Sequence, residues 1–389
     1  MKKFICGNDA VAEGVRLSRP HVISAYPITP QTIAVERLSE MVEDGSLKAE
    51  YMHVESEHSA LAAAMGVSSV GARAFTATSS QGLLYMAECL PYASGARMPI
   101  VMMNANRALA TPWNIYGDQM DAMFLLNSGW IQVYVEDAQE ALDMMIQAYK
   151  IAEHQNVMAP MMVNLDGFVL THTYEIVDIP TQEAVDAYLP PINLTDQVMT
   201  LEDPKSLCIS AGNDFNFEFK IKQEKDLQNS VKIIEEVDQS FAEAFGRAYG
   251  GMLDGYMCDD AEAILVTTGS ITGTTRIVVD ALRAEGKKVG LCKLRYLRPF
   301  PAEQIRTILK SAKRIGVIDK NISFGYEGTI YTNINSALLS LENAPKSYNF
   351  IGGLGGRDIT KENLKDAFEV LLSDKEEEKV QYMNVRCAE

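Results

Sequence analysis

The residue of this sequence with the clearest chemical meaning is Glu57, in the run Val54-Glu55-Ser56-Glu57-His58. Several alanines follow, so Glu57 is expected at the start of a closely packed helix in mostly apolar surroundings. Burying a carboxylate costs several kcal/mol unless a partner compensates for it. We therefore expect a ligand against this carboxylate. The alternative is an acid that only complements the dipole of its own helix.

One cofactor makes direct use of a carboxylate placed in this way. Thiamine diphosphate is activated when a carboxylic acid hydrogen-bonds a nitrogen of its pyrimidine ring. That bond favours the imino tautomer, which removes the proton from the thiazolium carbon. The protein then supplies only the carboxylate, and the neighbours Glu55 and His58 are expected to be structural or peripheral.

A second polar group lies in Tyr26-Pro27-Ile28-Thr29-Pro30, directly after the predicted strand 22–25. Pro27 and Pro30 restrict the backbone on both sides of Thr29. The hydroxyl of Thr29 is thus held in a rigid turn, where it can donate a hydrogen bond to a substrate carboxylate or carbonyl. The alternative is a capping hydroxyl for the helix that follows.

An arginine and two polar segments provide further candidates. Arg107 follows the predicted strand 100–104, and open α/β sheets bind ligands at the carboxyl ends of their strands. A guanidinium there can hold a carboxylate through two hydrogen bonds, or it can form a surface salt bridge. The loop 113–121 is rich in polar donors, as binding loops and plain surface loops both are. Ser80 and Gln81 open a predicted helix and can face an anion or a cofactor ring.

These residues require a scaffold of alternating strands and helices. Up to about residue 180 the alternation favours a parallel sheet covered on both faces. Residues 175–235 contain four prolines, and we expect a crossing segment or extended arm there. From residue 261 the alternation restarts and predicts a second, smaller parallel-sheet domain, so that the domains are 1–255 and 256–389. The predicted strands are 22–25, 74–77, 100–104, 131–135, 161–164, 263–267, 289–294, 314–319 and 349–352; the predicted helices are 32–42, 60–66, 83–92, 136–154 (amphipathic), 274–285, 302–310 and 329–341.

Length, charge and cysteine spacing exclude several classes of function. A chain of 389 residues exceeds the size at which one core keeps growing, which agrees with two domains. No apolar run reaches the ~18 residues of a membrane span, and no export signal is visible, so we expect a cytoplasmic protein that does not bind membranes. A net charge of −17 argues against nucleic acid. The six cysteines include no C-x-x-C pair, so no metal site, iron–sulfur cluster or disulfide framework is expected in this chain.

Two glycine-rich segments in the second half resemble phosphate loops only superficially. Residues 269–275 lack the lysine of a P-loop. Residues 352–357 do not fit the pattern G-x-G-x-x-G, because the final position is Asp358. We therefore reject ATP and NAD binding.

Taken together, several short motifs resemble the alpha subunit of the pyruvate:ferredoxin oxidoreductase (2-oxoacid:acceptor oxidoreductase) family. The resemblance covers nearly the whole chain. It implies an α/β fold: a pyrimidine-type thiamine diphosphate-binding domain, with helices on both faces of a parallel sheet, followed by a transketolase C-terminal-like domain. The motifs are Tyr26-Pro27-Ile28-Thr29-Pro30, Glu55-Ser56-Glu57-His58, Thr78-Ser79-Ser80-Gln81-Gly82-Leu83, Asn106-Arg107-Ala108, Gly117-Asp118-Gln119-x-Asp121 and Leu297-Arg298-Pro299-Phe300-Pro301.

The resemblance also implies roles for single residues. Glu57 would activate the cofactor, and Thr29 and Arg107 would hold the 2-oxoacid and take part in catalysis. Further contacts would come from these motifs and from the polar loop 113–121. For the cofactor they are Pro27, Ile28, Ser80 and Gln81, and for the substrate Asn114 and Asp118.

The chain lacks the G-D-G motif that holds a divalent metal and the diphosphate in such enzymes. The resemblance therefore implies partner chains. A beta subunit would carry the diphosphate half-site with Mg²⁺, and gamma and delta subunits, or their fusion, would carry 4Fe–4S clusters and the coenzyme A contacts. The expected reaction converts pyruvate, coenzyme A and oxidised ferredoxin into acetyl-CoA, carbon dioxide and reduced ferredoxin. The alternatives are 2-oxoisovalerate or another 2-oxoacid as the substrate, or a non-catalytic scaffold subunit.

Overall fold

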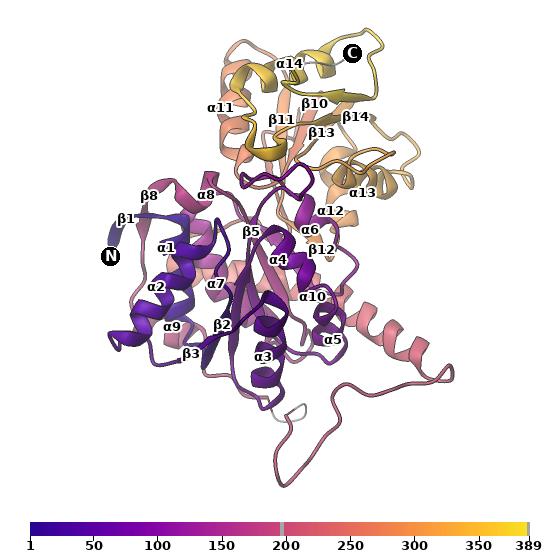
Figure 1. Cartoon of the computed structure of the whole chain (residues 1–389). Coiled ribbons are helices and arrows are strands. Elements are labelled where there is room, and N and C mark those ends of the chain that lie inside the picture. Colours follow the sequence, from indigo (N-terminus) through magenta and orange to yellow (C-terminus); the bar gives the residue numbers. More distant parts are fainter. Residues whose placement is uncertain (195–197, 387–389) are drawn as a thin grey trace.

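The computed structural model describes residues 1–194 and 198–386 and contains two large sheets with helices around them (Figure 1). The larger sheet has seven strands in the order β12-β6-β7-β5-β4-β2-β3. All its strands are parallel except β12, which comes from later in the chain and pairs antiparallel with β6 at one edge. The strands are β2 (Val22–Ala25), β3 (Glu50–His53), β4 (Ala74–Thr78), β5 (Val101–Asn106), β6 (Ile131–Tyr134), β7 (Met161–Asp166) and β12 (Tyr296–Arg298).

Helices cover both faces of this sheet, because successive strand residues point to opposite sides. Val101 and Met103 pack into a core with α1, α2 and α7, whereas Met102 packs into a second core with α3, α4 and α5. The predicted parallel sheet with two covered faces is confirmed, and we call it, with its helices, the N-terminal unit. Its helices are α1 (Gly7–Leu17), α2 (Thr32–Glu43), α3 (Glu57–Ser69), α4 (Ser80–Tyr85), α5 (Cys89–Gly95), α6 (Met120–Met123), α7 (Ala138–Ala152), α8 (Val169–His172), α9 (Gln182–Tyr188) and α10 (Asn216–Phe245).

The second sheet has six strands in the order β15-β14-β13-β10-β11-β9, and only β9 is antiparallel. Helices α11 and α14 share one core with this sheet, and α12 and α13 share the other. This C-terminal unit lies above the N-terminal unit in Figure 1. Its elements are β9 (Leu253–Tyr256), β10 (Ala263–Thr267), α11 (Ile271–Ala284), β11 (Val289–Leu294), α12 (Ala302–Leu309), β13 (Arg314–Asp319), α13 (Thr329–Leu338), β14 (Lys346–Ile351), η1 (Leu354–Gly356), α14 (Lys361–Leu372) and β15 (Val380–Tyr382).

The predicted domain boundary between residues 255 and 256 falls inside β9, whose antiparallel partner is β11 of the C-terminal unit. Strand β12 then returns to the edge of the N-terminal sheet. The chain therefore crosses between the two sheets more than once, and the division at residue 255 stays a prediction.

The prediction of irregular structure over 175–235 is wrong for much of that segment. The long helix α10 begins at Asn216, and its second half buries Ile233, Val237 and Phe241, which recur every four residues on one face. The start of α10 exposes phenylalanines, for example Phe217. Because the apolar face begins only midway along α10, the sequence pattern did not predict this helix. The described residues 189–194 and 198–215 form no helix or strand, and the segment that leads into α10 extends away from the body in Figure 1.

Two more elements departed from expectation. Strand β8 (Tyr174–Asp178) pairs antiparallel with β1 (Lys2–Cys6) in a separate two-stranded ribbon that the sequence pattern did not reveal. The helix predicted over 83–92 is divided into α4 and α5. Among the described cysteines, four are buried and Cys208 is exposed, while Cys387 lies outside the described residues. No helix in the described part of the chain is both long and apolar enough to cross a membrane.

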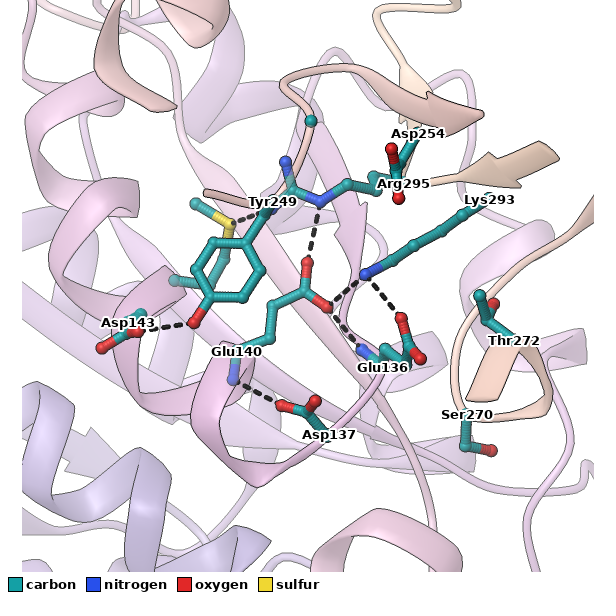
Figure 2. A network of polar contacts seen from close by, with 12 residues as sticks. Glu136, Asp137, Glu140, Asp143, Tyr249, Asp254, Ser270, Thr272, Lys293 and Arg295 are labelled. Atoms are coloured by element: carbon teal, nitrogen blue, oxygen red, sulfur yellow. Dashed lines mark hydrogen bonds and ion pairs between the residues drawn. The ribbon is translucent and has the colours of Figure 1, made fainter. Parts of the chain in front are cut away.

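Helix α7, predicted as an amphipathic helix over 136–154, is buried almost entirely, its polar residues included. Its polar face contacts a buried ion cluster, shown in Figure 2. The Glu140 carboxylate lies 2.8 Å from Lys293 Nζ and 2.8 Å from Arg295 Nε, and Lys293 also pairs with Glu136 at 2.9 Å. Burial alone would raise the pKa of Glu140, but the charges of Lys293 and Arg295 outweigh it and hold the pKa well below its ordinary value. The cluster joins α7 to the end of β11 and thus connects the two units.

Candidate functional site

The predicted site residues lie along one edge of the seven-stranded sheet. Strands β2, β3, β4 and β5 are parallel, so the segments that follow them emerge on the same side. Thr29 follows β2, Ser80 follows β4 and Arg107 follows β5. Glu57 follows β3 as the first residue of α3. This carboxyl edge is where open α/β sheets bind ligands.

Glu57 carries a buried carboxylate that has no partner in the described chain. The N-terminus of α3 is capped by Ser56, whose hydroxyl accepts a hydrogen bond from the Ser59 amide at 3.2 Å. The side chain of Glu57 is 8% exposed, and none of the described residues hydrogen-bonds it or forms an ion pair with it. A favourable interaction with the helix dipole does not account for that burial. The carboxylate is available to a ligand.

The surroundings of this carboxylate are made by a glycine and a threonine. A β-carbon added to Gly82 of α4 would stand 2.6 Å from Glu57 Oε1 and 2.7 Å from Thr78 Oγ1, which is too close for any side chain. Thr78 Oγ1 is buried and lacks a hydrogen-bond partner. The glycine thus allows a carboxylate and a hydroxyl to lie in contact with α4 while both retain free hydrogen-bonding capacity.

Asp121, near the start of α6, joins the segment that begins at Ser80 to the segment that contains Arg107. Its carboxylate accepts hydrogen bonds from the Ser80 amide at 3.0 Å, the Arg107 amide at 3.1 Å and Asn106 Nδ2 at 2.9 Å. Ser80 has a φ of 52°, a conformation that costs a non-glycine residue energy and persists only when its surroundings impose it. Burial raises the pKa of Asp121 in spite of its donors. Asp121 belongs to a quoted motif, but its role was not predicted, because its partners come from two other segments.

Arg107 and Thr29 are in direct contact, though not through the Thr29 hydroxyl. Arg107 Nη1 donates to the carbonyl oxygen of Thr29 at 2.8 Å, and the guanidinium lies 5.8 Å from the centre of the Trp113 ring. The arginine is 6% exposed, its Nε has no partner, and it pairs with no described carboxylate, so the surface salt bridge is excluded. Burial lowers the pKa of Arg107, while the charge of Asp121 opposes that shift. The guanidinium keeps donors free for an anionic ligand.

The turn around Thr29 is held by residues that sequence reasoning missed. Gln31, which is buried, donates to the Tyr26 carbonyl at 2.9 Å, and Asn8 donates to the Pro30 carbonyl at 2.9 Å. Gln31 is also the N-cap residue of α2, so the alternative that Thr29 caps this helix is wrong. The side chain of Thr29 is exposed at the carboxyl edge.

The remaining predicted residues divide into two groups. Pro27, which is exposed, and Ile28, which is half-buried, lie in the same turn as Thr29. Ser80 and the half-buried Gln81 lie at the start of α4, where Ser80 Oγ donates to the carbonyl of Ala108, the residue after Arg107, at 2.6 Å. Asn114 and Asp118 instead face the C-terminal unit. Asn114 Nδ2 donates to the Gly355 carbonyl at 3.1 Å, and Asp118 Oδ2 accepts from the Gly355 amide at 3.2 Å. Burial and the nearby Asp121 raise the pKa of Asp118 to about 6.

Two family profiles together match most of the chain. Residues 13–239 match the profile described as "Pyruvate flavodoxin/ferredoxin oxidoreductase, thiamine diP-bdg", and residues 261–364 match "Pyruvate:ferredoxin oxidoreductase core domain II". The chain is 50% identical over 365 residues to the pyruvate synthase subunit PorA of Methanothermobacter thermautotrophicus, covering 94% of each. It is 42% identical over 390 residues to the ketoisovalerate oxidoreductase subunit VorA of Pyrococcus abyssi, covering 99% of this chain and 98% of the relative.

Solved structures show the same fold at low sequence identity. A 2-oxoglutarate:ferredoxin oxidoreductase from Magnetococcus marinus superposes with a TM-score of 0.75 at 21% identity, over 96% of this chain and 65% of that chain, so this chain spans just under two thirds of its length. A split-gene transketolase superposes with a TM-score of 0.55 at 11% identity, over 95% of this chain and 99% of that chain. The predicted fold class, a thiamine diphosphate-binding α/β fold followed by a transketolase C-terminal-like α/β domain, is confirmed.

Proposed function

We propose that this chain, which belongs to the pyruvate:ferredoxin oxidoreductase family, provides the pyrimidine-binding half of a thiamine diphosphate site. It is the alpha subunit of a 2-oxoacid:ferredoxin oxidoreductase, an enzyme that acts with partner subunits. Among its relatives, pyruvate synthase subunits reach 50% identity and ketoisovalerate oxidoreductase subunits 42%. Pyruvate is therefore the proposed substrate, and 2-oxoisovalerate is the second candidate.

The observation that carries this proposal is the free, buried carboxylate of Glu57. Its position against Gly82 and beside the unpartnered Thr78 hydroxyl fits a ring nitrogen that must be hydrogen-bonded in a mostly dry site. When bound, thiamine diphosphate supplies the carbanion chemistry that releases carbon dioxide from a 2-oxoacid. Glu57 would hold a proton at the pyrimidine nitrogen, and the surrounding segments 27–28 and 80–81 would contact the ring.

Arg107 and Thr29 would bind the other reactant. The guanidinium is fixed by the Thr29 carbonyl and still has free donors, so it can receive the carboxylate of a 2-oxoacid without rearrangement. The exposed Thr29 hydroxyl can donate to the same carboxylate or to the 2-oxo group. Asn114 and Asp118, by contrast, are proposed to hold their own loop, residues 113–121, against Gly355.

Other chains would complete the catalyst. We propose a beta subunit with the diphosphate half-site and Mg²⁺, and gamma and delta subunits, or their fusion, with 4Fe–4S clusters and the coenzyme A contacts. Ferredoxin would be the electron acceptor. What supports this division is the absence of a G-D-G motif from the sequence and the subunit names of the relatives.

Gly82→Ala is expected to impair the cofactor site while leaving the fold intact. The new methyl would stand 2.6 Å from Glu57 Oε1 and would have to displace this carboxylate. We expect bound thiamine diphosphate and turnover of the assembled complex to fall together. The matched control is Gly95→Ala in α5, where an added β-carbon meets no atom within 4 Å. Equal losses in both variants would contradict this account of Gly82.

Arg107→Ala is expected to raise the KM for the 2-oxoacid by about 10- to 100-fold, since a hydrogen bond from a charged group contributes about 1.5–3 kcal/mol. The KM for coenzyme A should change little. Arg107→Lys should recover only part of the loss, because a lysine lacks the paired donors of a guanidinium. Steady-state kinetics of the purified complex provide the measurement. A parallel rise of both KM values would indicate a folding defect instead.

A further inference from the structure

Asp166, the last residue of β7, extends a buried carboxylate from the N-terminal unit into the C-terminal unit. Its oxygens accept hydrogen bonds from the Ser270 amide at 2.8 Å and the Ser270 hydroxyl at 2.6 Å, and Lys320 Nζ lies 2.8 Å away. Gly269 has a φ of +74°, and a β-carbon added to it would stand 2.6 Å from Asp166 Oδ2. The C-terminal unit therefore closes tightly around this one carboxylate.

The carboxylate occupies a characteristic place in the second sheet. Ser270 lies between β10 and α11, and Lys320 directly follows β13, the strand beside β10. After β10 the chain continues to β11, its neighbour toward one edge of the sheet. After β13 it continues to β14, its neighbour toward the opposite edge. Such a switch point, next to a helix N-terminus, is where doubly wound sheets bind anionic ligands. Here Asp166, an anion of the same chain, fills it, and this gives a structural reason why the glycine-rich segment 269–275 need not bind phosphate.

Asp166 lies next to both ends of the loop that carries Arg107, through its backbone at one end and through its carboxylate at the other. It pairs with Asn106, the residue before Arg107, in the register of β5 and β7. At the far end of the loop, Gln119 Nε2 donates to Asp166 Oδ1 at 3.1 Å, and the Gln119 amide donates to the Lys320 carbonyl at 2.8 Å. In between, the Gly356 amide donates to the Gly117 carbonyl at 2.7 Å.

We propose that Asp166 is a positioning residue for the substrate loop, residues 107–118. Its carboxylate joins Ser270 and Lys320 of the C-terminal unit to Gln119 at the far end of this loop, while its strand continues the sheet beside Asn106 at the near end, and these contacts together fix the direction of the Arg107 guanidinium. Contacts with the C-terminal unit thereby hold the substrate loop in one conformation. This inference rests on the proposed function of Arg107 in holding the 2-oxoacid.

The test compares Asp166→Asn and Asp166→Gly with the wild type in the assembled complex. Hydrogen exchange of peptides that cover residues 107–119 reports on the loop without requiring turnover. We expect faster exchange there and a rise of about tenfold or more in the KM for the 2-oxoacid, with the KM for coenzyme A unchanged. Added formate should restore protection of the loop in Asp166→Gly, because it can replace the missing carboxylate, but not in Asp166→Asn.

The control is Asp238→Asn, which removes another buried carboxylate. Asp238 accepts hydrogen bonds from the amides of Gly250 and Gly251 at 3.1 and 2.9 Å and does not touch the substrate loop. It should lower the thermal midpoint and leave loop exchange and KM unchanged. If the Asp166 variants behave in the same way, the inference is overturned and Asp166 is structural only. A cofactor-loaded complex that oxidises no 2-oxoacid would overturn the proposed function, while loop exchange would still decide whether Asp166 braces the loop.

Discussion

Glu57→Gln is expected to leave the complex assembled while lowering its turnover with a 2-oxoacid by about 10²- to 10⁴-fold, the range typical for loss of a positioned acid or base. Glutamine keeps the size of the side chain but cannot hold an ionisable proton at a ring nitrogen. The buried carboxylate of the wild type forms no hydrogen bond or ion pair with the described residues, so the substitution removes no such interaction within the chain. The measurement is coenzyme A-dependent reduction of a viologen dye, with subunit content checked by gel filtration.

Glu55→Gln is the matched control for this variant. Glu55 lies two positions away, is exposed, and accepts a hydrogen bond from the Ser59 hydroxyl at 2.6 Å. Its substitution should leave turnover close to that of the wild type. Retained activity in Glu57→Gln, at normal subunit content, would remove Glu57 from its proposed role.

Glu140→Gln is expected to cause a large loss of stability, because it removes the central carboxylate of the buried ion cluster. It would leave Arg295, which is fully buried, with only the more distant Asp238 at 3.6 Å and would take one of two carboxylates from Lys293. Removing one member of a buried ion pair costs about 3–5 kcal/mol, because the remaining charge stays desolvated. The measurement is the thermal midpoint or the denaturant midpoint of the purified complex.

The control for Glu140 is Glu376→Gln, which removes an exposed acid 3.3 Å from Lys346. Exposed pairs contribute about 0–1 kcal/mol, so the midpoint of the Glu376→Gln variant should not move measurably.

The pKa of Glu140 is lowered from 4.5 to about 2 in the fold. Its contribution is therefore complete above pH 4.5 and is lost as the pH falls toward 2, so the difference between wild type and Glu140→Gln should shrink over that window. A difference that grew in acid would contradict the ion-cluster account.

Much of the scaffold could be predicted because its apolar segments are short and bounded by polar residues. The strands Val22–Ala25 and Arg314–Asp319 have the predicted limits, and the buried setting of Glu57 was predicted from its alanine-rich neighbourhood. Helix α10 was not predicted because its buried face begins only around Ser230. The first half of the helix is mostly exposed and includes exposed phenylalanines. The burial of the polar face of α7 could not be predicted, because its partners Lys293 and Arg295 lie about 150 positions later in the chain.

The candidate site shows the same limit of local patterns. Thr29, Glu57 and Arg107 could be proposed from their immediate neighbours. Asp121 and Gly82 could not, because their importance arises from contacts between segments that meet only in the folded sheet. Likewise, the loop residues Asn114 and Asp118 hydrogen-bond Gly355, far along the chain, and a sequence pattern alone does not distinguish such contacts from substrate binding.

The central claim is tested most directly by coenzyme A-dependent viologen reduction with the natively purified complex, supplied in turn with pyruvate, 2-oxoisovalerate, 2-oxoglutarate and phenylglyoxylate. The account predicts reduction that requires a 2-oxoacid and is fastest with pyruvate. A preference for 2-oxoisovalerate would keep the reaction and change the substrate. A complex shown to contain thiamine diphosphate and iron–sulfur clusters that reduces the dye with none of these acids would contradict the proposed function.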